Sequence, residues 1–413
     1  MVLSKHVKLF RRVLGTLRRP RSGLKNRLVK LGKFSYLILS WAVELVGDLV
    51  FWRNRNPSPA IIDPKKILIV KVDELGDVLF STLLLPAIRD KYPQAEIDYL
   101  VRPGAEPVLQ NNPRITCLYH WNNVALDFLH GRGNRKNLPS KIRENRAVVR
   151  QLRSRNYDYV INARAYAPSA NLPLHRMGKR LIAFDISEHS FLADYWADYS
   201  LDEEEVRNYS QLLLPLGIEP TSVQHASEFY CIDANCPMEP GSHYAVISPV
   251  SFEVDRQWKA DCWREMIGRL TSEGCVVAMT GLPSHRVVLE SFIPERLRAS
   301  PDVRVFTDLP LPKFAALVKG ASCFAGIDSF PAHLAIALKC RAALLVNTSV
   351  YFLKGYSEHR FAIEARSMLP NAAEAAFFDI RFAQPEEVAL FCLGRSENPE
   401  SAHCTKVEPR DAY

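Results

Sequence analysis

Several features that mark other protein classes are missing from this 413-residue sequence. Its nine cysteines are odd in number, scattered and never spaced C-x-x-C, which argues against a disulfide framework and a structural zinc site. A reducing compartment fits this usage best. No G-x-G-x-x-G follows the first apolar strand-like run, so a dinucleotide-dependent oxidoreductase is not indicated.

An excess of positive charge is missing outside the first sixty residues. Residues 1–60 hold 13 Lys/Arg and 2 Asp/Glu, a local charge of +11, whereas the rest of the chain carries 40 basic and 43 acidic residues. The basic character therefore belongs to an N-terminal extension, and the body of the protein is close to neutral. This distribution argues against a nucleic-acid partner bound in a basic cleft.

The chain also lacks a long uninterrupted apolar run. The most apolar stretch, residues 36–52, is broken by polar residues that share one stripe of a helix, namely Ser40, Glu44, Gly47 and Asp48. A carboxylate at the centre of a membrane-spanning helix costs roughly 2.5–3.5 kcal/mol, so two of them argue against a span. The long basic region and the lack of a small-residue cleavage site argue against a signal peptide.

Two interpretations of residues 1–55 remain open. They form either a basic, amphipathic anchor on an anionic membrane surface, or a helix docked on the protein's own surface behind a solvated tail. The first predicts a cytoplasmic protein that is peripheral on the inner face of the cytoplasmic membrane.

The rest of the sequence alternates between strand and helix patterns. A linker, Asn56-Pro57-Ser58-Pro59, precedes the first apolar run. Short apolar, β-branched runs of the kind found in buried parallel strands occur at 67–72, 96–101, 157–162, 244–248, 275–280, 323–327 and 343–347. Helices are expected at 78–92 (with a kink at Pro86), 263–270, 312–319 and 331–338.

This alternation predicts an α/β protein with parallel sheets and ligands at the carboxyl ends of the strands. The length allows two such domains. We place an N-terminal domain at 61–225 and a C-terminal domain at 240–390. A basic helical extension at 1–60 and a tail at 391–413 flank them.

One segment of the first domain carries a family resemblance. The stretch ILIVKVDELGDVLFSTLLLPAIRDKYPQAEIDYLVRPG resembles the opening of glycosyltransferase family 9, the lipopolysaccharide heptosyltransferases. The segment from Ser248 to Trp258 looks like the family's loop with a basic residue two before a Trp. Residues 326–335, GIDSFPAHLA, look like its D-S-G-x-x-H-L-A signature. The resemblance covers roughly residues 64–365.

The resemblance implies a GT-B architecture, in which two Rossmann-like domains with parallel sheets face a central cleft. It also implies an inverting transfer of a heptose-like sugar, without a metal, from a nucleotide-sugar to a lipopolysaccharide-core or related glycan acceptor. The donor would be ADP-linked, and no further cofactor is expected. The expected partners are this nucleotide-sugar, an anionic glycolipid or glycan acceptor, and an anionic membrane surface through residues 1–55.

The family's catalytic base is the Asp of its L-G-D motif, which corresponds to Asp77. Inverting transfer needs one base to deprotonate the acceptor hydroxyl. Gly76 lets the backbone turn tightly beside it. An alternative is that Asp77 merely caps the following helix. Acceptor contacts could come from Gly76, Arg102 and Arg164, and the two arginines suit an anionic ligand.

The donor site is expected in the second domain. Negative charge on the leaving diphosphate could be stabilised by a basic side chain and by the free N–H groups at a helix start. The resemblance assigns these and the neighbouring donor contacts to Ser248, Arg256, Gly281, Asp328, Ser329, His333 and Thr348. A packed, structural role for His333 is an equally open alternative.

Three positions depart from the family pattern. Phe330 replaces the Gly of D-S-G, Asn347-Thr348-Ser349 replaces G-P-T, and the proline of the first helix is displaced to Pro86. The first two changes fall at the expected donor site. An alternative function is therefore a catalytically altered or inactive relative that acts as a membrane-associated scaffold.

Overall fold

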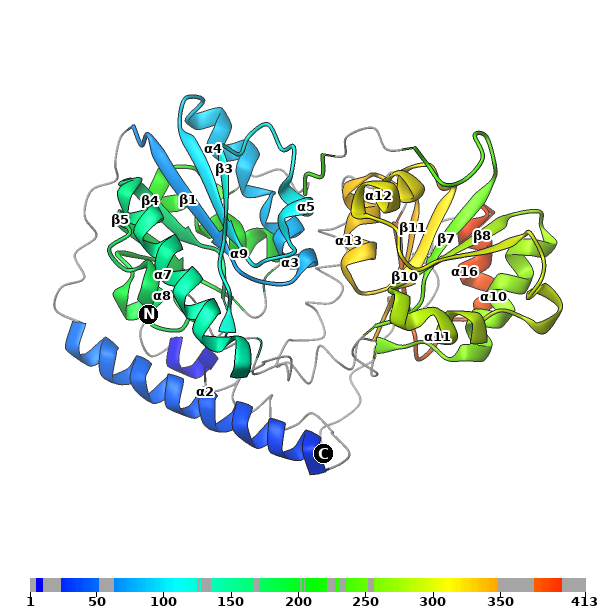
Figure 1. Cartoon of the computed structure of the whole chain (residues 1–413), viewed down its shortest axis with the longest axis horizontal. Helices are drawn as coiled ribbons and strands as arrows, with labels where there is room; N and C mark the ends of the chain where they lie inside the picture. The colour runs from blue at the N-terminus through cyan, green and yellow to red at the C-terminus, as the bar shows by residue number, and fades with distance from the viewer. Residues whose placement is uncertain are drawn as a thin grey trace. The chain divides into compact units, whose positions relative to one another are not determined.

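The chain forms two compact units. The structure is a computed structural model that describes residues 5–9, 24–51, 63–124, 127, 135–165, 171–200, 203, 205–220, 227–230, 235–251, 256–347 and 375–395. Among the described residues, those up to Glu228 belong to one unit and those from Phe229 onward belong to the other. Each unit is built on one six-stranded parallel sheet (Figure 1).

The first sheet has the order β3-β2-β1-β4-β5-β6. Its strands are β1 Lys66–Lys71, β2 Glu96–Val101, β3 Cys117–His120, β4 Tyr157–Asn162, β5 Gly178–Phe184 and β6 Tyr195–Ala197. The chain order reverses at β1, which pairs with β2 on one side and β4 on the other. In open α/β sheets ligands bind at this switch point, outside the carboxyl ends of the strands.

The second sheet repeats this topology in the order β12-β11-β10-β7-β8-β9. Its strands are β7 Tyr244–Ser248, β8 Val276–Thr280, β9 Val303–Phe306, β10 Cys323–Ile327, β11 Ala342–Val346 and β12 Ala375–Asp379. Here the switch point lies between β7 and β10, which are neighbours in the sheet. Both units therefore have the doubly wound strand order 3-2-1-4-5-6.

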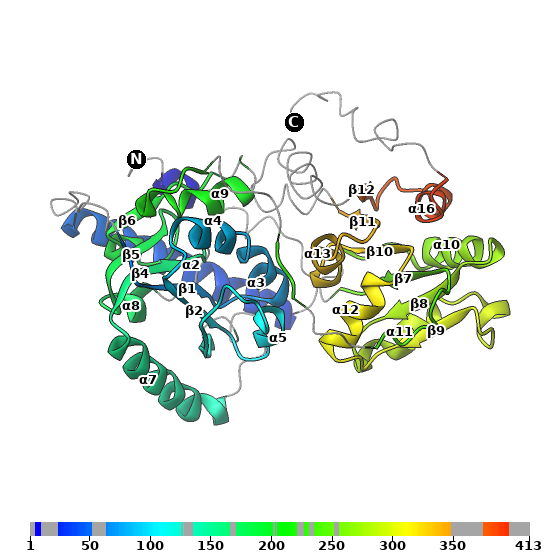
Figure 2. The same cartoon turned by 90° about the horizontal axis from the view of Figure 1, so that it is seen from above.

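Helices cover both faces of each sheet (Figure 2). Those of the first unit are α2 Leu24–Phe51, α3 Leu75–Ser81, α4 Leu84–Lys91, α5 Glu106–Leu109, α7 Leu138–Ser154, α8 Asn171–Leu174 and α9 Glu205–Gln211. Those of the second are α10 Ala260–Ser272, α11 Arg286–Ser291, α12 Leu311–Lys319, α13 Phe330–Ala337 and α16 Pro385–Cys392. Residues 5–9 form a further short helical segment.

The buried core of the second unit shows why its strands read as continuous apolar runs. Alternate residues of β7 enter different clusters. Ala245 and Ile247 pack with α10 and α16, while Tyr244 and Val246 pack with α12 and α13. A strand buried on both faces favours apolar residues at nearly every position. The parallel strands predicted at 244–248 and 323–327 are confirmed with these bounds, and every residue in them is buried.

The predicted helix at 78–92 is two helices. α3 starts at Leu75 and ends at Ser81, and α4 starts at Leu84. Pro86 has no N–H to give to the carbonyl of Thr82, and its ring would clash with that carbonyl in a continuous helix. Leu85 N donates to the Thr82 carbonyl instead, at 3.0 Å. The proline therefore breaks the helix four residues before its own position.

The N-terminal extension contains a helix longer than predicted. α2 begins at Leu24, twelve residues before the apolar stretch. No helix in the described part of the chain is long and apolar enough to cross a membrane.

Candidate functional site

The carboxyl edge of β1 carries the first half of the candidate site. Asp77 is the third residue of α3, and its side chain is 51% exposed. The helix cap is Glu74, which makes no side-chain capping bond. The alternative that Asp77 caps this helix is therefore wrong. Its carboxylate faces solvent at the switch point of the first sheet. Gly76 is the second residue of α3 and does not have a positive φ, so the tight turn expected at this glycine is not formed there.

A buried lysine lies next to Asp77. The Lys71 ammonium, at the end of β1, is 2.9 Å from Asp73 Oδ2 and 3.9 Å from Asp77 Oδ1. It also lies over the Tyr209 ring, 5.2 Å from its centroid. Burial lowers the pKa of Lys71 to about 8, and Arg164 lowers it further while the Asp77 carboxylate opposes the shift.

Sequence reasoning missed Lys71. The available signal was a single charged residue inside the apolar run ILIVKV. A charge in a strand that is buried on both faces needs a partner, and the partners follow two and six residues later. Lys71 thus links the strand's end to both carboxylates of the turn.

The two arginines expected to contact the acceptor lie at the same sheet edge but hold carboxylates of the first unit. Arg102 Nη1 is 2.6 Å from Glu74 Oε1, and its Nη2 is 3.2 Å from Asp127 Oδ1. Arg164 is almost completely buried and pairs with Asp73. Both guanidinium groups therefore fix the turn that presents Asp77, and acceptor contact by either one stays a prediction.

The second unit brings three predicted donor residues together. Arg256 Nη1 donates to the Asp328 carbonyl at 3.0 Å and lies 3.1 Å from Asp328 Oδ2. His333 Nε2 lies 3.6 Å from the other carboxylate oxygen, Asp328 Oδ1. Each of these side chains is about one-fifth exposed. An arginine, an acid and a histidine therefore meet at the carboxyl end of β10.

The start of α13 offers fewer N–H groups than a regular helix. Ser329 is the cap, and its carbonyl accepts from the N–H groups of Ala332 and His333. Pro331 has no N–H. Within the described residues this leaves the N–H groups of Ser329 and Phe330 without a protein partner. These two groups, beside Arg256, can receive an anion.

The other predicted donor residues end neighbouring strands. Ser248 closes β7 and is buried, and Gly281 follows β8. A Cβ on Gly281 would lie 3.1 Å from Leu289 Cδ1, so a side chain there would press on α11. Thr348 lies outside the described residues. Within them, no group of three or more His, Cys, Asp or Glu is placed to hold a metal ion.

Two doubly wound units with polar clusters at their switch points place the chain in the GT-B fold class, which solved structures confirm. A glycosyltransferase family 9 protein from Veillonella parvula matches with a TM-score of 0.65 and 17% identity over 82% of this chain and 100% of its own. E. coli heptosyltransferase WaaC with ADP matches with a TM-score of 0.61 and 18% identity, over 80% of this chain and 100% of its own.

Sequence relatives narrow the class to a family. The chain belongs to glycosyltransferase family 9 (heptosyltransferase), whose sequence model matches residues 145–375. Lipopolysaccharide heptosyltransferase 3 of Escherichia coli K12 is 27% identical over 305 residues, 69% of this chain and 81% of that protein. Lipopolysaccharide heptosyltransferase 1 of Pseudomonas aeruginosa is 25% identical over 291 residues, 66% of this chain and 76% of that protein. The chain is thus a glycosyltransferase.

The environment of Lys71 predicts a pH-dependent stability. Its folded pKa of about 8 lies below the ordinary value of 10.5, so the unfolded chain binds more protons between these pH values. The free energy of unfolding should therefore rise with pH across this window, by up to about 1.4 kcal/mol per unit relative to Lys71→Met. Urea unfolding of both proteins from pH 7.5 to 10 measures the difference.

Lys65→Met is the matched control for this comparison. Lys65 is two-thirds exposed, and its variant should keep a constant difference from the wild type over the same pH range. A constant difference for Lys71→Met as well would contradict the buried, paired position of Lys71.

Proposed function

We propose that this enzyme transfers a heptose-like sugar from an ADP-linked donor to a lipopolysaccharide-core or related anionic glycan acceptor, with inversion and without a metal. The half-exposed carboxylate of Asp77 at the switch point of the first sheet carries the proposal. The donor class is supported by solved family members, because E. coli WaaC has been solved with ADP and with ADP-2-deoxy-2-fluoro heptose.

Asp77 is the proposed general base. As the acceptor hydroxyl oxygen attacks the anomeric carbon, its proton passes to the Asp77 carboxylate. The bond from that carbon to the diphosphate oxygen breaks on the opposite side, and the leaving group takes the electron pair. One displacement of this kind inverts the anomeric carbon.

Among the neighbouring carboxylates, Asp77 has the setting that suits a base. Asp73 is buried between Lys71 and Arg164, and Glu74 pairs with Arg102. Within the described part of the chain, Asp77 has one distant ionic neighbour, the Lys71 ammonium at 3.9 Å, and about half of its side chain is open to solvent. An acceptor hydroxyl can therefore reach it.

The leaving diphosphate is the proposed ligand of the second unit. Arg256 supplies a positive charge, and the N–H groups of Ser329 and Phe330 supply two further donors. Such preorganised donors stabilise the charge that develops as the bond breaks. Because these protein groups can stabilise the leaving diphosphate themselves, they support transfer without a metal.

Asp328 and His333 would complete the donor contacts. The Asp328 carboxylate lies between Arg256 and His333, so it can orient both while an oxygen accepts from a sugar hydroxyl. The partly exposed His333 at 3.6 Å from Asp328 supports a ligand contact over a purely packed role.

A nucleotide-sugar screen tests the donor assignment. ADP-heptose at about a hundred times its dissociation constant should stabilise the protein by about 2.7 kcal/mol, which raises the melting temperature by several degrees. UDP- and GDP-sugars serve as controls and should shift it less. Thermal unfolding followed by fluorescence measures this.

The same screen separates the enzyme from a silent scaffold. Phe330 occupies the first position of α13, where the family has glycine, and a scaffold that had lost its donor site would show no shift with any nucleotide-sugar or nucleoside diphosphate. That outcome would overturn the proposed function. A shift with another base would correct the donor alone.

A further inference from the structure

The polar stripe of α2 faces the protein, contrary to the usual orientation of a surface helix. Glu44 and Asp48 are about 2% and 1% exposed, although both are carboxylates. Glu44 accepts hydrogen bonds from Ser190 Oγ at 2.6 Å and from the Phe191 N–H at 3.3 Å. Both donors belong to η3 (Ser190–Leu192), so α2 is docked on the first unit by its charged side.

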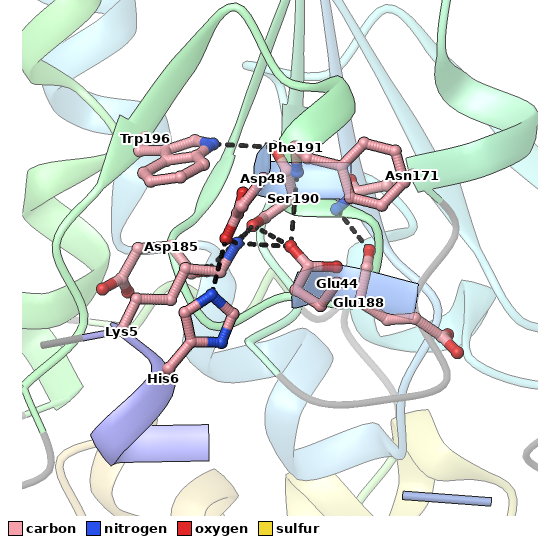
Figure 3. A network of polar contacts seen from close by, with 10 residues as sticks. All are labelled: Lys5, His6, Glu44, Asp48, Asn171, Asp185, Glu188, Ser190, Phe191 and Trp196. Atoms are coloured by element: carbon pink, nitrogen blue, oxygen red, sulfur yellow. Dashed lines mark hydrogen bonds and ion pairs between the residues drawn. The ribbon is translucent and has the colours of Figure 1, made fainter. Parts of the chain in front are cut away.

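A lysine from the preceding segment neutralises these buried carboxylates. Lys5 is fully buried, and its ammonium donates to Glu44 at 2.5 Å, to Asp48 at 2.8 Å and to Ser190 Oγ at 2.7 Å (Figure 3). It also lies 4.4 Å from the centre of the Trp196 ring. A buried ammonium with three oxygen partners is fully satisfied, so it holds segment 5–9, α2 and η3 together.

Two further contacts show that this docking is close. A Cβ on Gly47 would lie 2.3 Å from Phe191 Cδ1, so only glycine lets the helix approach the ring. The Tyr36 hydroxyl donates to Glu188 Oε1 at 2.5 Å. Tyr36, Glu44, Gly47 and Asp48 of α2 therefore all contact the first unit or segment 5–9.

The opposite side of α2 is apolar and exposed. Its most exposed side chains are Leu39 at 65%, Val46 at 59%, Leu49 at 72% and Val50 at 67%. Ile38, Val43 and Leu45 are each about 40% exposed beside them. Residues 39, 43, 46 and 50 follow helical spacing, so they form one continuous strip. We call these seven residues the outer strip. A contiguous apolar surface of this kind marks an interaction site.

The excess of basic residues around α2 indicates which partner covers the outer strip. The first sixty residues carry 13 basic side chains, and their two acidic ones, Glu44 and Asp48, are buried against Lys5. Four of the basic residues, Lys25, Arg27, Lys30 and Lys33, lie in the first third of α2 itself. Exposed leucine and valine with excess positive charge is the pattern of a helix that lies in an anionic membrane surface.

We propose that α2 is a membrane-binding helix that lies in the plane of an anionic bilayer. The contacts of Lys5 with Glu44, Asp48 and Ser190 hold its charged side against the protein, so that its outer strip enters the membrane interface. A spanning arrangement would pull Glu44 and Asp48 away from Lys5 into lipid. The two interpretations of the sequence, a membrane anchor and a helix docked on the protein, are therefore compatible. One side of α2 docks on the protein while the other side binds the membrane. The proposal does not rest on sugar transfer, since it concerns residues that the transfer chemistry does not use.

Vesicle flotation of the full-length protein tests the proposal. Wild type should bind vesicles of 30% phosphatidylglycerol in phosphatidylcholine and bind pure phosphatidylcholine much less. The double variant Leu39→Asp/Leu49→Asp should lower the partition coefficient by about a hundredfold or more. It removes two apolar side chains that would enter the bilayer and adds two negative charges that anionic lipids repel. Both sites are exposed in the free protein, so the variant should fold, and circular dichroism checks this.

Val287→Asp is the matched control, because Val287 is 79% exposed on α11 of the second unit. It should bind like wild type. Equal vesicle binding by the outer-strip variant, or no binding by wild type, would overturn the proposal. So would a wild-type dimer, detected by light scattering, that the outer-strip variant dissociates, since a second copy would then cover the strip. Thermal stabilisation by ADP-heptose should be the same in all three proteins.

Discussion

Asp77→Asn should lower the turnover number for sugar transfer by about two to four orders of magnitude and leave donor affinity nearly unchanged. Asparagine has the size of aspartate but cannot accept the acceptor proton. α3 should be unaffected, because Asp77 is not its cap. Steady-state transfer rates and a separate titration with ADP measure the two effects.

Asp90→Asn is the control for this substitution. Asp90 is an exposed carboxylate on α4 of the same unit, and its variant should keep wild-type rates. Substantial turnover by Asp77→Asn would refute the base assignment. Weaker ADP binding with an unchanged turnover number would instead place Asp77 among the donor contacts.

Arg256→Ala should lower kcat/KM by about a hundredfold to a thousandfold and weaken the binding of ADP. The guanidinium group is the basic side chain held beside the start of α13 by Asp328. Without it, the diphosphate would face the Asp328 carboxylate with no intervening positive charge. Kinetics with varied donor and inhibition by ADP separate the loss in binding from the loss in rate.

Arg256→Lys and Arg264→Ala are the two controls for this prediction. Lysine keeps the charge and is the residue that the family resemblance leads us to expect, so a large part of the activity should return. Arg264 is a partly exposed arginine that pairs with Asp261 on α10, and its removal should be silent. If Arg256→Ala had wild-type activity, as expected for Arg264→Ala, the proposal that Arg256 stabilises the leaving group would be wrong.

The sequence predicted the sheets well because buried parallel strands leave a strong signal. Runs such as 157–162 and 323–327 are mostly apolar and buried on both faces, and their bounds are the observed ones. The four edge strands β3, β6, β9 and β12 were missed, and so was the inner strand β5, which begins with the polar sequence GKR. β3 and β9 are largely exposed or half-buried and therefore carry no continuous apolar run.

The orientation of α2 could not be predicted from its own sequence. An amphipathic pattern gives two faces, and the usual rule buries the apolar one. Here the charged face is buried because Lys5 and η3, 39 and 146 residues from Glu44, supply its partners. Such long-range pairing leaves no local signal.

The candidate site was predicted in part for a similar reason. Asp77, Arg256 and Asp328 follow from motifs, and the structure brings Arg256, Asp328 and His333 together. The sequence did not show that Arg164 and Asp73 pair, or that Lys71 contacts the same turn. The Arg164–Asp73 pair joins the ends of β1 and β4, which are neighbours in the sheet but about ninety residues apart in the chain. The Lys71 contacts are local, and the lone charge in the apolar run ILIVKV was their only signal.

The anomeric configuration of the product tests the account's central claim most directly. Wild-type enzyme should be incubated with ADP-heptose and a lipopolysaccharide-core oligosaccharide that lacks the terminal heptose, and the new linkage examined by NMR. We predict a heptosylated product whose anomeric configuration is opposite to that of the donor, as one displacement with Asp77 as base requires. A product with the donor's configuration, or hydrolysis of the donor without transfer, would contradict it.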